Sequence, residues 1–184
     1  MGRALFAGIL SAISAVTVVG GAAPAQAREP VPITDFTLPG IRDGHQIICP
    51  FDVHVGVVAN EEFQEVTTLA DGTTITRITG KLVLSFTNDA TGKTIVRNVS
   101  GATTKTAHPE TSDHPVTGTE VGADNNWWGF GPKSRANTGE PGLVFTSGPV
   151  ELQFTGNVVT RSSVFGSQVN GCALLEGPSA LNSA

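Results

Sequence analysis

The chain has 184 residues, of which 11 are Lys or Arg and 16 are Asp or Glu, so its formal net charge at pH 7 is −5. The sequence contains neither a long run of like charges nor a basic stripe. It therefore lacks the electrostatic pattern of a nucleic-acid-binding protein and the basic amphipathic helix of a membrane-surface protein.

Residues 1–27 have the order of a secretory signal peptide. Arg3 gives a positive start, residues 4–19 are apolar apart from Ser and Thr, and Ala25-Gln26-Ala27 forms an A-x-A cleavage site. The apolar run is shorter than the roughly 20 residues that span a bilayer. We expect cleavage after Ala27, an extracellular location, and no membrane insertion of the mature chain.

The mature chain has the length of one domain. We expect a Pro- and Gly-rich N-terminal arm over residues 28–44, a single β domain over residues 45–176, and a flexible tail over residues 177–184. The two cysteines are Cys49 and Cys172. Because paired thiols in a secreted protein usually oxidise, we predict a structural disulfide that joins the first strand to the last.

The mature sequence is typical of antiparallel strands. Segments 82–86 and 150–154 place an apolar residue at every second position, which is the period of a half-buried strand. Turn signals such as Asp71-Gly72 separate these runs, and no segment has a long helical spacing. We predict an all-β fold in which an antiparallel meander closes into a β-barrel, with a two-sheet β-sandwich as the alternative.

The segment "DNNWWGFGP", residues 124–132, contains both tryptophans. Adjacent strand residues point to opposite faces, so Trp128 and Phe130 are expected to pack in the core together. Trp127 shares its face with two glycines, which leave its ring bare for a ligand. With Lys133 and Arg135 of the following loop, Trp127 forms the predicted ligand-binding site. The alternative is that Trp127 covers glycines of neighbouring strands and binds nothing.

Two groups of residues are candidates for chemistry. Asp52 and His54 lie on the same face of a strand and are candidates for an acid–base pair, although such residues more often face solvent. The residue types that bind divalent metals occur together in one loop, but their spacing matches no zinc motif, so no metal site and no cofactor is predicted. These weak metal candidates are His108, Glu110, Asp113 and His114.

Arg97 lies on the same face as Ile95 and Val99 in the segment "TIVRNV". If this face points inward, the guanidinium is buried and needs a partner such as Asp52 or Glu65. We favour a structural ion pair, and an anion anchor in a cavity is the alternative.

Several segments of the mature chain resemble a group of small secreted proteins of actinobacteria. The segments are "TTLADGTTITRITGKLVLSFTNDATGKTIVRNVSG", "NWWGFGP", "NTGEPGLVFTSGPV" and "NGCALL". The resemblance implies a single secreted bacterial domain, and it implies no catalytic residue because the group has no assigned activity.

The sequence thus predicts a secreted, non-enzymatic β-barrel module that binds a small ligand or an extracellular polymer, and not nucleic acid. Two alternatives remain open. The first is a barrel enzyme of isomerase or cyclase type that uses Asp52 and His54. The second is an extracellular inhibitor or envelope interaction protein that acts through the loop at residues 131–142.

Overall fold

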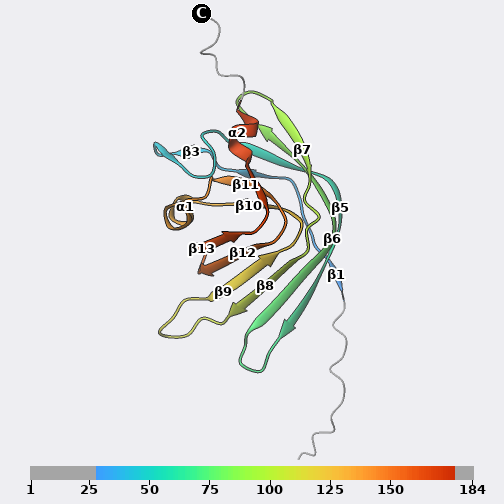
Figure 1. Ribbon diagram of the computed structural model, residues 1–184, viewed down its shortest axis with the longest axis vertical. Coiled ribbons are helices and arrows are strands. Elements are labelled where there is room, and N and C mark those ends of the chain that lie inside the picture. Colours follow the sequence, from blue (N-terminus) through green and yellow to red (C-terminus); the bar gives the residue numbers. More distant parts are fainter. Residues whose placement is uncertain (1–27, 177–184) are drawn as a thin grey trace, which may run out of the picture.

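The computed structural model describes residues 28–176, so the predicted signal peptide (1–27) and tail (177–184) lie outside the described residues. Strands make up more than half of the described chain, and its two helices are short (Figure 1). The strands are β1 (Glu29–Pro30), β2 (Phe36–Leu38), β3 (Ile41–Arg42), β4 (His45–Gln46), β5 (Val53–Thr68), β6 (Thr74–Asn88), β7 (Thr94–Asn98), β8 (Thr103–His108), β9 (Thr117–Gly122), β10 (Asn125–Gly129), β11 (Leu143–Ser147), β12 (Val150–Thr155), β13 (Val158–Val164) and β14 (Ser167–Asn170). The helices are α1 (Pro132–Thr138) and α2 (Gly171–Leu175).

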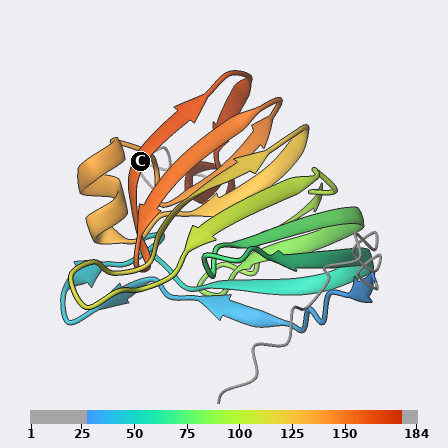
Figure 2. The same cartoon turned by 90° about the horizontal axis from the view of Figure 1, so that it is seen from below.

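A main sheet of nine antiparallel strands forms the outer layer. Its central path runs β1-β5-β6-β8-β9-β12-β13, with β2 added to β5 and β7 added to β6. Figure 2 shows the strong curvature of this sheet, from the blue and green strands to the orange and red ones. The long β5–β6 hairpin turns at Asp71-Gly72, where the sequence signal predicts a turn. Within residues 28–176 no helix is long and apolar enough to cross a membrane.

A second sheet, β10-β11-β14, lies inside this curve and will be called the inner sheet. The chain leaves the main sheet after β9, forms β10 and β11, and returns as β12, which pairs with β9. The end strands β1 and β13 of the described main sheet do not pair with each other. The predicted barrel closure is therefore wrong, and two packed antiparallel sheets fit the sandwich alternative better.

Both faces of β11, the central strand of the inner sheet, are covered, because this strand lies between the two arms of the curved main sheet (Figure 1). Leu143 and Phe145 pack with β5 and β6, in a cluster that includes Val55 and Phe86. Val144 packs in a second cluster with Phe130 and two residues of β12. Residues 143–146 are consequently all buried, and this strand does not show the alternation of a half-buried one.

A disulfide joins the segment between β4 and β5 to helix α2, and not the first strand to the last as expected. Cys49 and Cys172 form a disulfide with 123 residues of sequence separation, which confirms the predicted pair. Residues 28–44, the predicted N-terminal arm, contain three short strands: β1 and β2 pair with β5, and β3 forms a small hairpin with β4. Short strands at a sheet edge tolerate the prolines of this segment.

Helix α1 lies in a segment that was predicted to be a loop. Gly131 is its N-cap, Pro132 opens the first turn, and Gly139 ends it in the left-handed region with a φ of 75°. The helix packs beside the outer strand β13 (Figure 2). The buried Ser134 Oγ accepts a hydrogen bond from the Val159 N–H at 3.0 Å, so α1 covers the edge of the main sheet.

Candidate functional site

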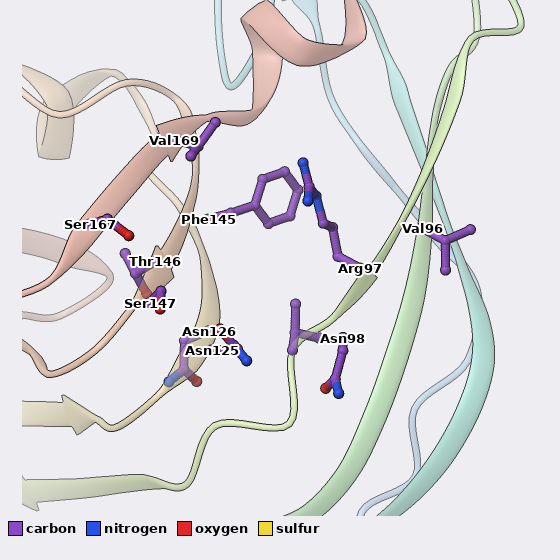
Figure 3. A pocket seen from close by; sticks show the side chains of 11 residues that line it. Val96, Arg97, Asn98, Asn125, Asn126, Phe145, Thr146, Ser147, Ser167 and Val169 are labelled. Atoms are coloured by element: carbon purple, nitrogen blue, oxygen red, sulfur yellow. The ribbon is translucent and has the colours of Figure 1, made fainter.

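A cavity of about 310 Å³ lies between β7 and the inner sheet (Figure 3). It combines one charged side chain with amide, hydroxyl and apolar groups. It is lined by Val96, Arg97, Asn98, Val99, Asn125, Asn126, Phe145, Thr146, Ser147, Ser167 and Val169. Ligand pockets range from about 300 to 1,000 Å³, so this cavity suits a small ligand or a short part of a larger one.

The strand register arranges the floor of this cavity in two rows. Ser147 is paired with Asn125 on β10 and with Ser167 on β14, and all three are exposed. Two residues along the same strand, Phe145 is paired with Val169. Because residues two apart on a strand share a face, a polar row and an apolar row lie side by side on one face of the inner sheet.

Arg97 forms the opposite wall of the cavity. It is paired with the buried Leu84 of β6, and its side chain reaches from β7 toward the inner sheet (Figure 3). The guanidinium carbon lies 5.5 Å from the centre of the Phe145 ring, which is a cation–π contact. The Nε atom is buried and has no hydrogen-bond partner.

The expected ion pair of Arg97 is not formed. The two carboxylates proposed as its partners bind other arginines: Asp52 lies 2.9 Å from Arg42, and Glu65 lies 3.2 Å from Arg28. Within residues 28–176 no carboxylate lies at ion-pair distance from Arg97. A cation with one buried and unsatisfied N–H therefore faces a cavity, and an anion would complete its hydrogen bonding.

Trp127 does not present a bare ring. It packs against the first core cluster, with its ring centre 6.0 Å from that of Phe36 and 5.8 Å from that of Phe86. The expectation of a free Trp127 ring is wrong, because the face that carries the glycines points toward β2 and β6. Trp128 and Phe130 lie in the second cluster, where the Trp128 Nε1–H donates to Thr146 Oγ1 at 3.2 Å.

The three residues of the predicted ligand site are not brought together. Arg135 donates from Nη2 to the Gln46 carbonyl at 2.7 Å and thereby fixes α1 to β4. Lys133 is exposed and lines a different cavity of about 410 Å³ with Pro132 and Val158. Lys133 is the only charged side chain of that cavity, and no buried polar atom without a partner lines it.

Asp52 and His54 contact different partners. The Asp52 carboxylate accepts from the Gly40 N–H at 2.6 Å and pairs with Arg42, and these contacts hold the pKa of this carboxyl below its usual value. His54 Nε2 lies 3.9 Å from Asp35, and its side chain is 46% exposed. The structure therefore does not place the two residues as an acid–base pair in a cavity.

The His-Pro loop does not assemble a metal site in the described chain. His108 Nδ1 is hydrogen-bonded to Thr73 Oγ1 at 3.2 Å, and the residues of the loop tip, including Asp113 and His114, are exposed. Within residues 28–176 no three His, Cys, Asp or Glu side chains are grouped in a way that would hold a metal ion.

A smaller cavity of about 220 Å³ is lined by residues of β8, β9, β12, β13 and the turn between β12 and β13. Lys105 and Glu120 are cross-strand partners there, and the Lys105 ammonium lies 4.8 Å from the centre of the Phe154 ring. Burial raises the pKa of the Glu120 carboxyl, while the charge of Lys105 opposes that rise. None of the residues that line this cavity carries a buried polar atom without a partner, so it lacks the unsatisfied group of the Arg97 cavity.

Sequence reasoning identified Arg97 but missed the residues that surround it. Asn125, Ser147 and Ser167 come from three strands and meet only through the register of the inner sheet. The available signal was the inward position of Arg97 in an apolar face, since a buried guanidinium requires a partner.

The chain matches no protein-family model, and neither a curated protein nor a solved structure matches it. The resemblance to secreted actinobacterial proteins accordingly stays a prediction.

Proposed function

We propose that the protein is a secreted, non-enzymatic binding module that holds an anionic group, such as a carboxylate, against Arg97 in the cavity between β7 and the inner sheet. The observation that carries this proposal is the buried Arg97 Nε–H without a partner. The adjacent polar row of Asn125, Ser147 and Ser167 offers hydrogen bonds to a ligand, and Val169 offers an apolar contact. The disulfide agrees with an oxidising extracellular environment.

If Arg97 holds the anionic group, replacing it should weaken the affinity for a small carboxylate. Replacing a charge-assisted hydrogen bond by none costs about 1.5–3 kcal/mol, so Arg97→Met is expected to weaken the binding of a small carboxylate by roughly 10- to 100-fold. Methionine keeps an unbranched side chain on the Phe145 ring, which limits the loss of packing. Calorimetric titration of the mature protein with acetate, benzoate and N-acetylated amino acids measures the affinity.

Arg161→Met is the matched control. Arg161 is an exposed arginine of β13 that lines none of the three cavities, and its replacement changes the net charge equally. Its affinity should equal that of the parent. If both variants weaken binding to the same extent, or if the parent binds none of these carboxylates, the proposed function is refuted.

A further inference from the structure

Strand β14 has one free edge. It is one of the two edge strands of the inner sheet, pairs only with β11, and all four of its residues are exposed. Within the described chain no backbone hydrogen bond engages residues 167–170 outside the strand ladder. Alternate residues of such an edge point unpaired N–H and C=O groups away from the sheet, and these groups can pair with another extended chain.

The edge of the main sheet at β13 is covered by side chains of α1, in contrast to the free edge of β14. At β13 the Val159 N–H donates to Ser134 Oγ, and the Asn137 side-chain amide donates to the Val159 carbonyl. Helix α1 thus satisfies edge groups of the main sheet. Proteins generally cover or disrupt their sheet edges, so an edge left open beside a cavity is a candidate for strand addition.

The free edge borders the cavity that contains Arg97. Ser167 and Val169 belong both to β14 and to the cavity lining, and Arg97 faces them from β7 (Figure 3). A chain that pairs with β14 would therefore run along the mouth of this cavity. The part of that chain opposite Val169 would lie near the guanidinium, because Phe145, the ring beneath Arg97, is paired with Val169.

The aromatic rings near the cavity disfavour a saccharide. Sugars are usually held on a free aromatic face. Here Arg97 covers the Phe145 ring, and Trp127 lies between Phe36 and Phe86. The groups that remain available are a cation, small polar side chains and strand backbone, which are the groups that recognise a peptide end.

We propose, on the basis of the function proposed above, that the ligand is the C-terminal end of an extended peptide. The peptide adds to β14 as the fourth strand of the inner sheet, and its terminal carboxylate accepts hydrogen bonds from Arg97. The Asn125, Ser147 and Ser167 side chains bind polar groups near that end. Val169, which is 44% exposed, contacts an aliphatic side chain of the peptide.

The first test compares peptide libraries that differ only at the C-terminus. Hexapeptide pools anchored through their N-termini, with either a free acid or an amide at the C-terminus, are exposed to the labelled mature protein. Selected sequences are then titrated in solution. We expect the free acid to bind roughly 10- to 100-fold more tightly than its amide, as for a charge-assisted hydrogen bond. Arg97→Met should abolish this difference, and Arg161→Met should preserve it.

The second test examines the strand pairing. The selected peptide is N-methylated at alternate residues in each of the two possible registers. One register removes N–H groups that pair with β14 and should lower affinity at least tenfold, while the other should bind as the parent peptide does. On the protein, Gln168→Pro and Val169→Pro remove adjacent N–H groups that point in opposite directions. Gln168 is not among the residues that line the cavity, so Gln168→Pro, if it keeps its melting temperature, should lose peptide binding and retain benzoate binding. Val169 lines the cavity, so Val169→Pro is compared with the parent for peptide binding alone.

Two outcomes separate this inference from the proposed function. If benzoate binds in an Arg97-dependent manner but the acid and amide peptides bind equally, or both methylation registers bind equally, the peptide inference is wrong and the carboxylate site stands. If neither small carboxylates nor peptides depend on Arg97, both proposals are wrong. Strand addition would also be wrong if both β14 proline variants fold and bind the peptide as tightly as the parent does.

Discussion

At the scale of single residues, Glu62 is a buried carboxyl group without a cation beside it. Its side chain lies in β5 opposite Gly80, the residue is 7% exposed, and in the described chain no Lys, Arg or His lies at ion-pair distance. Burial raises the pKa of the Glu62 carboxyl above its ordinary value. The folded protein therefore holds this proton more tightly than the unfolded chain does, and ionisation costs folding free energy.

The sign of this effect predicts the behaviour of Glu62→Gln. The cost of ionisation is absent below the unfolded-state pKa of about 4.3, grows as the pH rises, and is complete above the folded-state pKa. Glu62→Gln should therefore raise the free energy of unfolding at pH 7 and leave it nearly unchanged at about pH 3.5 relative to the parent. Urea denaturation at both pH values measures the difference.

Glu61→Gln serves as the control, because its side chain is 69% exposed and lies 3.9 Å from Lys81. Its effect should stay within about 0.5 kcal/mol at either pH. A Glu62→Gln protein that is less stable than the parent at pH 7 would mean that the ionised carboxylate makes a stabilising contact.

Arg97 and Trp127 show why residue roles are harder to predict than residue faces. Strand alternation places Arg97 on the same face as Ile95 and Val99 and separates Trp127 from Trp128, and the structure agrees with both assignments. The alternation does not say what lies opposite each face. Trp127 meets Phe36 and Phe86, whereas Arg97 meets Phe145 and a cavity.

At the scale of secondary-structure elements, the sequence pattern correctly predicts the buried residues of strands that have only one covered face. Leu82, Leu84 and Phe86 are buried, in agreement with their alternation in β6. β11 is covered on both faces, and nothing in its short apolar run distinguishes an inner sheet from an outer one. Helix α1 has seven residues, which is too short for a recognisable helical spacing of apolar residues. The sequence signals of this helix are therefore Pro132 at its start and Gly139 at its end.

The edge-covering role of α1 leads to a prediction for Ser134→Ala. This change leaves the Val159 N–H without its hydrogen-bond acceptor in a site where Ser134 is 5% exposed. We expect a loss of about 1–2 kcal/mol of unfolding free energy, which is the usual cost of an unsatisfied buried donor. Chemical denaturation measures this loss, and hydrogen exchange at Val159 should become faster.

Lys133→Ala is the matched control, since it changes the preceding and exposed residue of the same helix. Alanine favours helix slightly more than lysine does, so stability should not fall. Equal stability of Ser134→Ala and the parent would show that water replaces the hydroxyl and that α1 is not needed at this edge.

At the scale of the whole molecule, the excursion of the chain into the inner sheet decides the architecture. Consecutive hairpins in the sequence suggested a closed barrel, but β10 and β11 leave the main sheet and β14 joins them from the far end of the chain. The inner sheet fills the curve that a barrel would enclose as its lumen. This pairing of distant segments is also what creates the Arg97 cavity, which explains why the local sequence pattern could not predict it.

The disulfide holds this arrangement together, because it joins the segment before β5 to α2, which directly follows β14. A cross-link that closes a loop of this size, with 123 residues of separation, removes conformational entropy from the unfolded chain and stabilises the fold by about 4–5 kcal/mol in the chain-entropy model. The Cys49→Ala/Cys172→Ala protein should therefore melt roughly 10–15 °C below the oxidised parent. Calorimetry of both proteins without reductant measures the shift. The parent in reductant is the control and should melt close to the double variant. Equal melting temperatures of the oxidised parent and the double variant would mean that the two core clusters fix the ends of the chain without the covalent link.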